Sequence, residues 1–316
     1  MPPSLSIASL AIPLLLALVL DLAVGDPPNR YHPVAWMGSG IAAACRHAPK
    51  LGRWAPFAFG AGLMAAGVIL TVAAGLAVER ALTHLPLLLG WLLEAWLLKT
   101  TLAARGLARA AGQIRKALEA SDLPLARRLT GWHLVSRDTS QLGEAHVAAA
   151  AVESVAENTS DGIIAPLLYY AIGGLPGALA YRFVNTADAM LGYRDPAREW
   201  LGKAPARLDD LANLLPSRLT AALIVLASLL LGENARQAWR VWRRDAGKTA
   251  SPNAGHPMSA MAGALGLELE KIGHYRLGVG QSQPKAEHIG RAVRLMYATT
   301  ALAVGVMAPL IIALWR

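Results

Sequence analysis

The chain has 316 residues, of which 54% are hydrophobic and only 16% charged, and its formal net charge is +9. Average soluble domains are about 25% charged, so this composition argues against a soluble domain and predicts an integral membrane protein. The basic residues are spread over several polar segments without a recognition motif beside them, and nucleic acid is therefore not an expected partner. The single cysteine, Cys45, permits no intrachain disulfide.

Four apolar segments are long enough to cross the hydrocarbon core of a bilayer, which takes about 20 helical residues. They are residues 4–24, 55–78, 85–102 and 295–315. Two further segments are ambiguous, because residues 163–185 contain the helix-breaking run GGLPG and residues 219–232 are short. Each could cross, or could enter and leave on one side where protein or water covers its free backbone groups. The expected fold class is all-α: a polytopic membrane protein with one integral membrane domain over residues 1–316, about four full spans plus two re-entrant or short spans, and helical cytoplasmic loops.

The distribution of Lys and Arg predicts the orientation, since positive charge is enriched in cytoplasmic loops. Basic residues crowd the segments after the first and third apolar segments, namely Arg30, Arg46, Lys50, Arg53, Lys99, Arg105, Arg109, Arg115, Lys116, Arg127, Arg128 and Arg137. The turn at residues 79–84 carries only Arg80, balanced by Glu79. Both basic segments are therefore predicted to be cytoplasmic and the N-terminus to be outside. No basic leader precedes the first apolar segment, which is expected to be a retained anchor.

The polar segments are expected to be helical. Residues 99–130 have apolar residues at helical spacing, with a break at residues 122–124. A second helix is predicted to begin near residues 138–140, whose side chains suit an N-cap. No strand is predicted anywhere.

Three acidic residues recur at helical spacing in the second of these helices. Glu153, Glu157 and Asp161 are at i, i+4 and i+8, so a regular helix places them on one face. Like charges at this spacing repel, and a bound cation would remove the repulsion; Mg²⁺ prefers carboxylate oxygens. The alternative is a solvated acidic stripe that pairs with nearby arginines.

A second polar group follows the fifth apolar segment. Asp209 and Asn213 are one helical turn apart, Asp210 is adjacent, and Arg207 and Arg218 flank them. This group repeats the combination of carboxylates, Asn and Arg, and it is a second candidate site for a metal or for phosphate groups.

Other polar residues lie at the ends of apolar segments or inside them. Asn185 and Asp188 are at i and i+3 at such an end, where polar residues are often functional, although Asn185 could equally cap a helix. Glu94 lies within an apolar segment and should face the helix bundle or a cavity, paired or protonated. The run SPNAG at residues 251–255 cannot be regular helix; it could aim backbone N–H groups at an anion, or simply lead into a helix.

Six motifs follow one another along the chain. They are DLxxGDPxxxxHPVxxxG from Asp21, RDTS from Arg137, ESVAENTxDGxIAP from Glu153, PGALAYRxVNTxDxMxGY from Pro176, ARLDDLxNxxPxRLT from Ala206, and SPNAG from Ser251 followed by MAGALG from Met261. With these motifs in this order over essentially the whole chain, the sequence resembles the adenosylcobinamide-phosphate synthase family of cobalamin biosynthesis, called CobD or CbiB. It departs from the family pattern at Thr249, where His is usual, and at Met258, where Glu is usual.

The resemblance implies an enzyme of the cell (inner) membrane with several spans and an active site that faces the cytoplasm. Such an enzyme attaches aminopropanol, or its O-phosphate, to the free propionate of adenosylcobyric acid through an amide bond. The resemblance also implies ATP and Mg²⁺ as cofactors and the corrinoid as substrate, and it makes other late cobalamin-pathway membrane enzymes candidate partners beside the lipid bilayer. The residues are compatible with this chemistry, because carboxylates can hold Mg²⁺ and Arg can bind phosphates with two parallel hydrogen bonds.

Candidate site residues follow from the polar groups and from the motifs. The predicted catalytic residues are Glu153, Glu157, Asp161, Asp209 and Asp210, of which the first three are also the predicted metal ligands. The predicted substrate-binding residues are Asp26, His32, Arg137, Asp138, Thr139, Asn158, Asn185, Asp188, Arg207, Asn213, Arg218, Ser251 and Asn253. Arg137, Arg207 and Arg218 are expected to bind phosphate groups; the alternative is that they pair with Asp138, Asp209 or Asp210 and hold helices together.

Two other classes of function remain open from the sequence. A membrane transporter with sites at broken helices would place polar residues inside several spans, whereas here most lie between spans. A non-catalytic scaffold for corrinoid enzymes would not need dense groups of Asp, Asn and Arg. A purified-protein assay for the amide product separates both from an enzyme.

Overall fold

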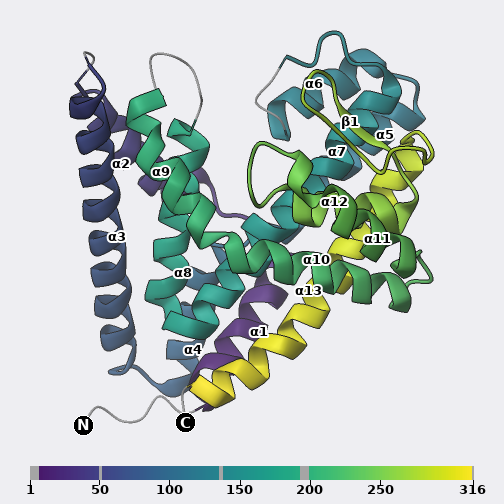
Figure 1. Ribbon diagram of the computed structural model, residues 1–316. Helices are drawn as coiled ribbons and strands as arrows, with labels where there is room; N and C mark the ends of the chain where they lie inside the picture. Colours follow the sequence, from purple (N-terminus) through teal and green to yellow (C-terminus); the bar gives the residue numbers. More distant parts are fainter. Residues whose placement is uncertain (1–6, 50–51, 135–137, 193–198, 315–316) are drawn as a thin grey trace. The chain divides into compact units, whose positions relative to one another are not determined.

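The computed structural model describes residues 7–49, 52–134, 138–192 and 199–314, which are almost entirely helical (Figure 1). The chain divides into two compact units. Unit 1 comprises Met1–Ala103, Ala165–Asn213 and Val306–Arg316, and unit 2 comprises Ala104–Ile164 and Leu214–Gly305. The helical fold predicted from the composition is confirmed.

Unit 1 is built from helices of 13 to 29 residues, most of which are apolar. They are α1 (Ile7–Val24), α2 (Pro33–Cys45), α3 (Trp54–Leu82), α4 (Leu87–Lys99), α8 (Ala165–Leu191) and α9 (Glu199–Ala212), together with the last residues of α13 (Ala286–Leu314). The sequence placed α2 in a polar loop. Its start is nevertheless encoded locally, because Pro33 occupies the first turn and His32 caps it by accepting a hydrogen bond from the Val34 N–H.

Helix α3 packs closely against α8 because glycines line the contact. A Cβ on Gly67 would lie 1.9 Å from the ring of Phe183, and one on Gly75 would lie 2.6 Å from the Cα of Pro176. Small residues allow this close approach between helices in lipid, where apolar burial alone gives little driving force. The contact holds the C-terminal half of α8 in place.

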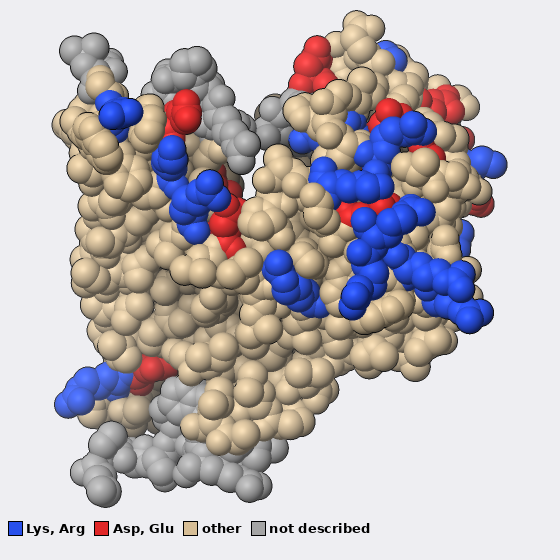
Figure 2. Space-filling view, in the orientation of Figure 1, with Lys and Arg blue, Asp and Glu red and all other residues tan. Residues whose placement is uncertain are grey.

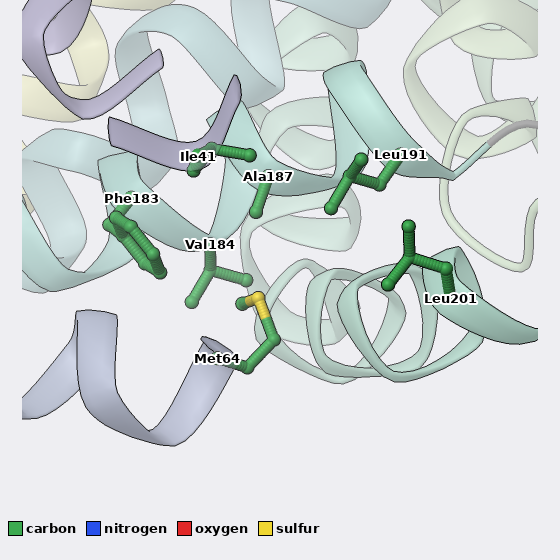
Figure 3. Close-up of a cluster of buried hydrophobic side chains, with 7 residues drawn as sticks. All are labelled: Ile41, Met64, Phe183, Val184, Ala187, Leu191 and Leu201. Carbon is green, nitrogen blue, oxygen red and sulfur yellow. The ribbon is translucent and has the colours of Figure 1, made fainter. Parts of the chain in front are cut away.

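A hydrophobic cluster continues this contact toward α9 (Figure 3). Figure 3 shows side chains from four helices meeting there: Ile41 of α2, Met64 of α3, Phe183, Val184, Ala187 and Leu191 of α8, and Leu201 of α9. The cluster fixes the register of α8 against α9, and these two helices carry most of the polar residues described below for unit 1.

The predicted break at GGLPG is confirmed as a kink inside α8. Gly173 and Gly174 have non-helical backbone angles, and Gly174 has a φ of +62°, which favours glycine. The backbone N–H of Leu175, freed by the kink, donates to Glu79 Oε1 at 2.9 Å. A side chain from α3 thus satisfies the broken segment, as a helix interrupted at membrane depth requires.

Glu94 also faces the protein interior, as predicted. Its side chain is buried, and its Oε1 accepts a hydrogen bond from the hydroxyl of Tyr170 at 2.6 Å. This pair joins α4 to the first half of α8.

Unit 2 contains shorter helices and one hairpin. Its elements are α5 (Ala104–Glu119), α6 (Leu123–His133), α7 (Glu144–Thr159), a π-helical turn (Ser160–Ile164), α10 (Leu214–Leu230), α11 (Ala235–Asp245), α12 (Gly255–Leu265), β1 (Leu269–Lys271), β2 (Tyr275–Leu277) and residues 286–305 of α13. The break predicted between α5 and α6 is confirmed, with Asp122 capping α6 through the Leu125 N–H.

Two expectations for unit 2 are wrong. The helix expected to begin near residues 138–140 is α7, which begins at Glu144 with Gly143 as N-cap. The Asp138 carboxylate does not cap it, because it accepts hydrogen bonds from the N–H and the Oγ of Ser140. The antiparallel hairpin, in which Leu269 pairs with Leu277, was not predicted. Strands of three residues are too short to show the alternation by which a strand is recognised.

The helices have the lengths of a polytopic membrane protein. Among the described residues, three helical stretches are long and apolar enough to cross a membrane: Trp54–Leu82, Glu144–Leu191 and Ala286–Ile311. Counting the bent pairs α4 with α5 and α9 with α10 as one span each gives up to five. The charged residues of α3 itself are Glu79 and Arg80 near its C-terminal end, and Figure 2 shows a long surface without charged side chains along the left of the molecule, where Figure 1 places α3. The predicted spans at 55–78 and 295–315 are confirmed, while the first apolar segment forms a shorter described helix, Ala11–Val24.

Asp245 anchors α11 in unit 2. It is fully buried, and its carboxylate accepts hydrogen bonds from Arg244 Nε and Nη2 at 2.8 Å and from the Gly278 N–H at 2.7 Å, with Lys248 as a further ion-pair partner. Burial acts to raise the pKa of Asp245, but these partners lower it to about 2.

Asp245→Asn is therefore expected to destabilise the protein by about 2 kcal/mol at neutral pH. Because the folded-state pKa lies below the ordinary value of 3.8, this stabilisation is present above about pH 4 and is lost as the pH falls toward 2. Thermal unfolding of both proteins in detergent should show a gap at pH 7 that shrinks below pH 4. A gap of unchanged size at pH 2 would contradict this account.

Candidate functional site

A buried polar network joins the C-terminal half of α8 to α9. Asp209, which is 9% exposed, accepts hydrogen bonds from Asn213 Nδ2 at 2.9 Å and from Asn185 Nδ2 at 3.3 Å. The two amide oxygens are also used: Asn213 Oδ1 accepts from the Tyr181 hydroxyl at 2.9 Å, and Asn185 Oδ1 accepts from Arg182 Nη1 at 3.1 Å. We call these five residues the Asp209 network. It satisfies a buried carboxylate with amide donors and places a guanidinium at its edge.

Helix periodicity accounts for each half of the Asp209 network. Asp209 and Asn213 are one turn apart on α9 and at its end, and Arg182 and Asn185 are one turn apart on α8. Tyr181 stacks on Tyr169, with ring centroids 5.0 Å apart, and the Tyr169 hydroxyl donates to the Ala212 carbonyl at 3.0 Å. The aromatic pair thus holds the end of α9 against α8.

A pocket of about 260 Å³ lies beside the Asp209 network in unit 1. It is lined by Gly192, Glu199, Gly202, Lys203, Ala206, Arg207 and Asp210. Lys203 and Arg207 are one turn apart on α9, and Arg207 contacts Asp210 at 3.4 Å. The pocket therefore offers both cations and carboxylates to a small polar ligand.

Glycines at this pocket permit close backbone packing. A Cβ on Gly202 would lie 1.8 Å from the Leu191 carbonyl oxygen, and one on Gly192 would lie 2.1 Å from Asp188 Oδ1. Asp188 therefore covers the backbone at the end of α8, next to the pocket.

Asp26 and His32 meet a lysine that the sequence analysis did not select. Lys99, at the end of α4, has a fully buried side chain; its Nζ donates to the Gly25 carbonyl and lies 3.4 Å from Asp26 Oδ1. His32 Nε2 is 3.7 Å from the same oxygen. Burial acts to raise the pKa of Asp26, but His32 and Lys99 together hold it below its usual range. The three side chains form a second polar group of unit 1.

In unit 2, Arg218 and Asn253 come together. Arg218 Nη1 donates to Asn253 Oδ1 at 3.2 Å, and the Ser217 hydroxyl donates to the same oxygen at 3.4 Å. Ser251 Oγ accepts from the N–H groups of Asn253 and Ala254, at 3.2 and 3.4 Å. Residues 251–254 are non-helical as predicted, and Gly255 begins α12. The N–H groups of Asn253 and Ala254 are used within the turn, which agrees with the helix-entry alternative, and the anion-binding alternative stays a prediction.

The three acidic residues of the α7 segment differ in burial and in local winding. Glu153 is buried, Glu157 is half-buried one turn later, and Asp161 lies in the π-helical turn that follows α7. In the part of the chain that the structure describes, no three His, Cys, Asp or Glu side chains converge closely enough to hold a metal ion. A metal at these carboxylates would need ligands from outside this set, and the predicted metal site stays a prediction.

The remaining predicted residues have local roles or lie outside the description. Thr139 is buried and donates to the Arg127 carbonyl at 2.9 Å, and Asn158 Nδ2 donates to the Ser154 carbonyl at 2.9 Å. Asp138 forms the turn with Ser140. Arg137 lies outside the described residues. The predicted set therefore falls into separate groups in unit 1 and unit 2.

Three residues of the polar groups were missed at the level of sequence. Tyr181 and Arg182 lie within the motif at residues 176–193, but no spacing rule distinguishes them there from core and surface residues. Lys99 ends an apolar segment, where a lysine usually marks the membrane boundary. Only its tertiary position shows that it is buried.

The apolar helices define a polytopic helical membrane protein with groups of polar residues at the helix ends. The family model described as CobD/Cbib protein matches residues 14–296, and the chain belongs to this family. It is 45% identical over 276 residues to the cobalamin biosynthesis protein CobD of Dehalococcoides mccartyi, a match that covers 84% of this chain and 85% of that one.

Two further relatives cover nearly as much. The probable cobalamin biosynthesis protein CobD of Methanothermobacter thermautotrophicus is 41% identical, covering 93% of this chain and 97% of that one. The cobalamin biosynthesis protein CbiB of Salmonella typhi is 39% identical, covering 91% of this chain and 93% of that one. No solved structure shows significant similarity to the chain.

Proposed function

We propose that this protein is an enzyme of cobalamin biosynthesis that joins aminopropanol, or its O-phosphate, to the free propionate of adenosylcobyric acid by an amide bond, driven by ATP. Family membership over residues 14–296 supports the pathway. The observation that supports a catalytic role is the Asp209 network. Its side chains come from two separate motifs, at residues 176–193 and 206–220, and they are hydrogen-bonded to one another.

The proposed reaction balances through an activated acid. The propionate oxygen attacks the terminal phosphorus of ATP, which forms an acyl phosphate and releases ADP. The amine then attacks the acyl carbon, inorganic phosphate leaves, and a base takes the amine proton. Cations suited to phosphate groups line the unit 1 pocket, where Lys203 and Arg207 are one turn apart. Glu199 and Asp210 offer carboxylates to an ammonium group.

The α7 carboxylates fit Mg²⁺ as part of its ligand set. Mg²⁺ in phosphate-transferring enzymes is usually held by one or two carboxylates together with substrate phosphates and waters. Glu153 and Glu157, with Asn158 beside them, supply that number of protein oxygens on one helix. Bound there, Mg²⁺ would neutralise charge on the phosphate groups.

An assay with purified protein in lipid tests the proposal. The full chain is incubated with adenosylcobyric acid, MgATP and either aminopropanol or aminopropanol phosphate, and the products are followed by mass spectrometry. The expected result is an amide product whose formation equals ADP release. A scaffold or a transporter would give no product with either amine, and that result would overturn the proposal.

Glu157→Gln is expected to raise the Mg²⁺ concentration needed for half-maximal turnover by about tenfold or more, because it removes a charged ligand and keeps the side-chain shape. Titration of Mg²⁺ at saturating ATP measures the effect. Glu144→Gln, at the first turn of the same helix, is the matched control and should leave the Mg²⁺ dependence unchanged. If Glu157→Gln leaves the Mg²⁺ requirement unchanged, the acidic residues of α7 form only a solvated face and do not bind the metal.

We further propose that residues 186–218 face the cytoplasm. With Cys45 replaced by Ser, a cysteine at Lys203 should resist a membrane-impermeant thiol reagent applied to the outside of intact cells. A cysteine at His84, in the turn predicted to be outside, should react under the same conditions. Reaction at position 203 from outside would contradict this orientation.

A further inference from the structure

Helix α11 in unit 2 has one face packed against the protein and one exposed face. A Cβ on Gly263 of α12 would lie 2.5 Å from the Gln237 carbonyl oxygen and 2.7 Å from the Cα of Ala238, so the two helices touch backbone to backbone. The buried residues of α11 are Ala235, Ala238, Val241 and Asp245. This contact fixes the rotation of α11 and therefore the side chains that point outward.

The exposed face of α11 carries an aromatic residue among cations. Arg236, Trp239, Arg240 and Arg243 recur at one-turn spacing and are exposed, and the Arg243 guanidinium lies 5.6 Å from the Trp239 ring. We call these four residues the α11 face. Figure 2 shows Lys and Arg side chains gathered over the part of unit 2 where Figure 1 places α11.

The positive charge of the α11 face is not neutralised by the protein. Within the described chain, Arg236 and Arg240 have no acidic partner. The nearest carboxylates are occupied elsewhere: Asp245 is held by Arg244 and Lys248, and Glu233 is paired with Arg291. Unpaired guanidinium groups at one-turn spacing are suited to a surface of anionic groups.

Exposed leucines adjoin the α11 face along the chain. The end of α10 and the turn after it present Leu226, Leu229, Leu230 and Leu231, of which Leu229 and Leu230 are 66% and 69% exposed. Gly232, with a φ of +69°, and the N-cap Asn234 then reverse the chain into α11. Within a few residues the exposed surface changes from leucines to a helix face on which three arginines surround a tryptophan. Leucines suit the acyl chains of a bilayer, tryptophan suits its interface, and arginines suit its anionic headgroups.

We propose that the α11 face binds the phosphate groups of anionic phospholipids at the membrane surface, with the leucines of α10 among the acyl chains. A soluble phosphate compound would use the arginines but would leave Trp239 and the leucines in water. An acidic protein would likewise leave the leucines uncovered. The lipid surface is the partner that accounts for the apolar and the basic residues together.

The test uses the full chain in bilayers that contain spin-labelled phosphatidylglycerol or spin-labelled phosphatidylcholine. Electron spin resonance measures the relative association of the two lipids with the protein. The triple variant Arg236→Gln, Arg240→Gln, Arg243→Gln is compared with a control triple variant of equal charge, Arg109→Gln, Lys116→Gln, Arg128→Gln, which removes exposed cations of α5 and α6. Thermal unfolding confirms that both variants are folded.

The native protein and the control variant should prefer phosphatidylglycerol, and the α11 variant should lose at least about threefold of that preference, since each cation near a membrane surface contributes measurably. Equal loss in both variants would show general electrostatic attraction and would overturn the proposal. So would an unchanged preference in the α11 variant. Full displacement of the labelled lipid by millimolar inorganic phosphate at constant ionic strength would instead show a site for soluble phosphate.

Discussion

Asp209→Asn is expected to lower the rate of amide formation by about a hundredfold or more, the scale seen when one preorganised polar group of an active site is removed. Asn at this position keeps one oxygen and has an NH₂ group in place of the other, which then faces the NH₂ group of either Asn185 or Asn213. Rotation of the Asn185 amide would turn its NH₂ group toward Arg182, and rotation of the Asn213 amide would require the Tyr181 hydroxyl to accept instead of donate. The Asp209 network therefore loses a charged acceptor and must rearrange its hydrogen bonds around an uncharged residue.

The control for this prediction is Asp245→Asn, which makes the same chemical change at another buried and fully paired carboxylate. It should lower thermal stability but keep the turnover of each folded molecule. Both variants are assayed at a temperature at which thermal unfolding shows them folded. Turnover of Asp209→Asn within threefold of the native rate would show that the network serves packing alone.

Asp26→Asn is expected to lower the stability of unit 1 by about 2 kcal/mol, because it leaves the buried ammonium of Lys99 without its anionic partner. The estimate lies below the value for a fully buried pair because the Asp26 side chain is 40% exposed. For a chain of this size the loss corresponds to a decrease in Tm of about 3 °C. Thermal unfolding in detergent at pH 7 measures it.

The double variant Asp26→Asn, Lys99→Met tests whether the loss of stability comes from the interaction between the two residues or from each residue alone. Met fills a volume similar to that of Lys without a charge, so it removes the unpaired ammonium and should recover most of the lost stability. The coupling energy from this double-mutant cycle should exceed about 1 kcal/mol. Additive losses would show that Asp26 and Lys99 act independently.

The pH dependence of the Asp26–Lys99 pair follows from the direction in which folding shifts the pKa of Asp26. The pKa of Asp26 is lowered in the folded protein, so the pair stabilises the fold above the ordinary pKa of 3.8 and loses this effect only as the pH falls through the folded value. Loss of function between pH 5 and 8 therefore has another origin than protonation of Asp26.

The sequence by itself determined the fold class, because the fold class depends on local properties of the chain, such as the length of its apolar segments and the places where helices break. Apolar length predicted α3 and α13, the Gly-Pro run predicted the kink in α8, and the Asp-Leu-Pro run at residues 122–124 predicted the break between α5 and α6. Motif order also predicted the family, since it needs only residue identities along the chain.

Sequence reasoning failed where an outcome depended on competition between partners. Asp138 and Ser140 look like an N-cap, but they bond to one another and the helix starts at Glu144. Asp161 has the spacing of a third carboxylate in a regular helix, but it lies in a π-helical turn that the sequence did not predict. Local rules assume regular winding and free side chains, and neither holds here.

Tertiary structure alone decided which polar residues act together. Asp209 is hydrogen-bonded to Asn185, 24 residues earlier, and Lys99 lies beside Asp26, 73 residues earlier. Helical periodicity relates residues within a few turns, so it predicted Asp209 with Asn213 but could not select Tyr181, Arg182 or Lys99 as partners. These pairings arise from the packing of α8 on α9 and of α4 beside the loop after α1, which brings distant side chains within hydrogen-bonding distance.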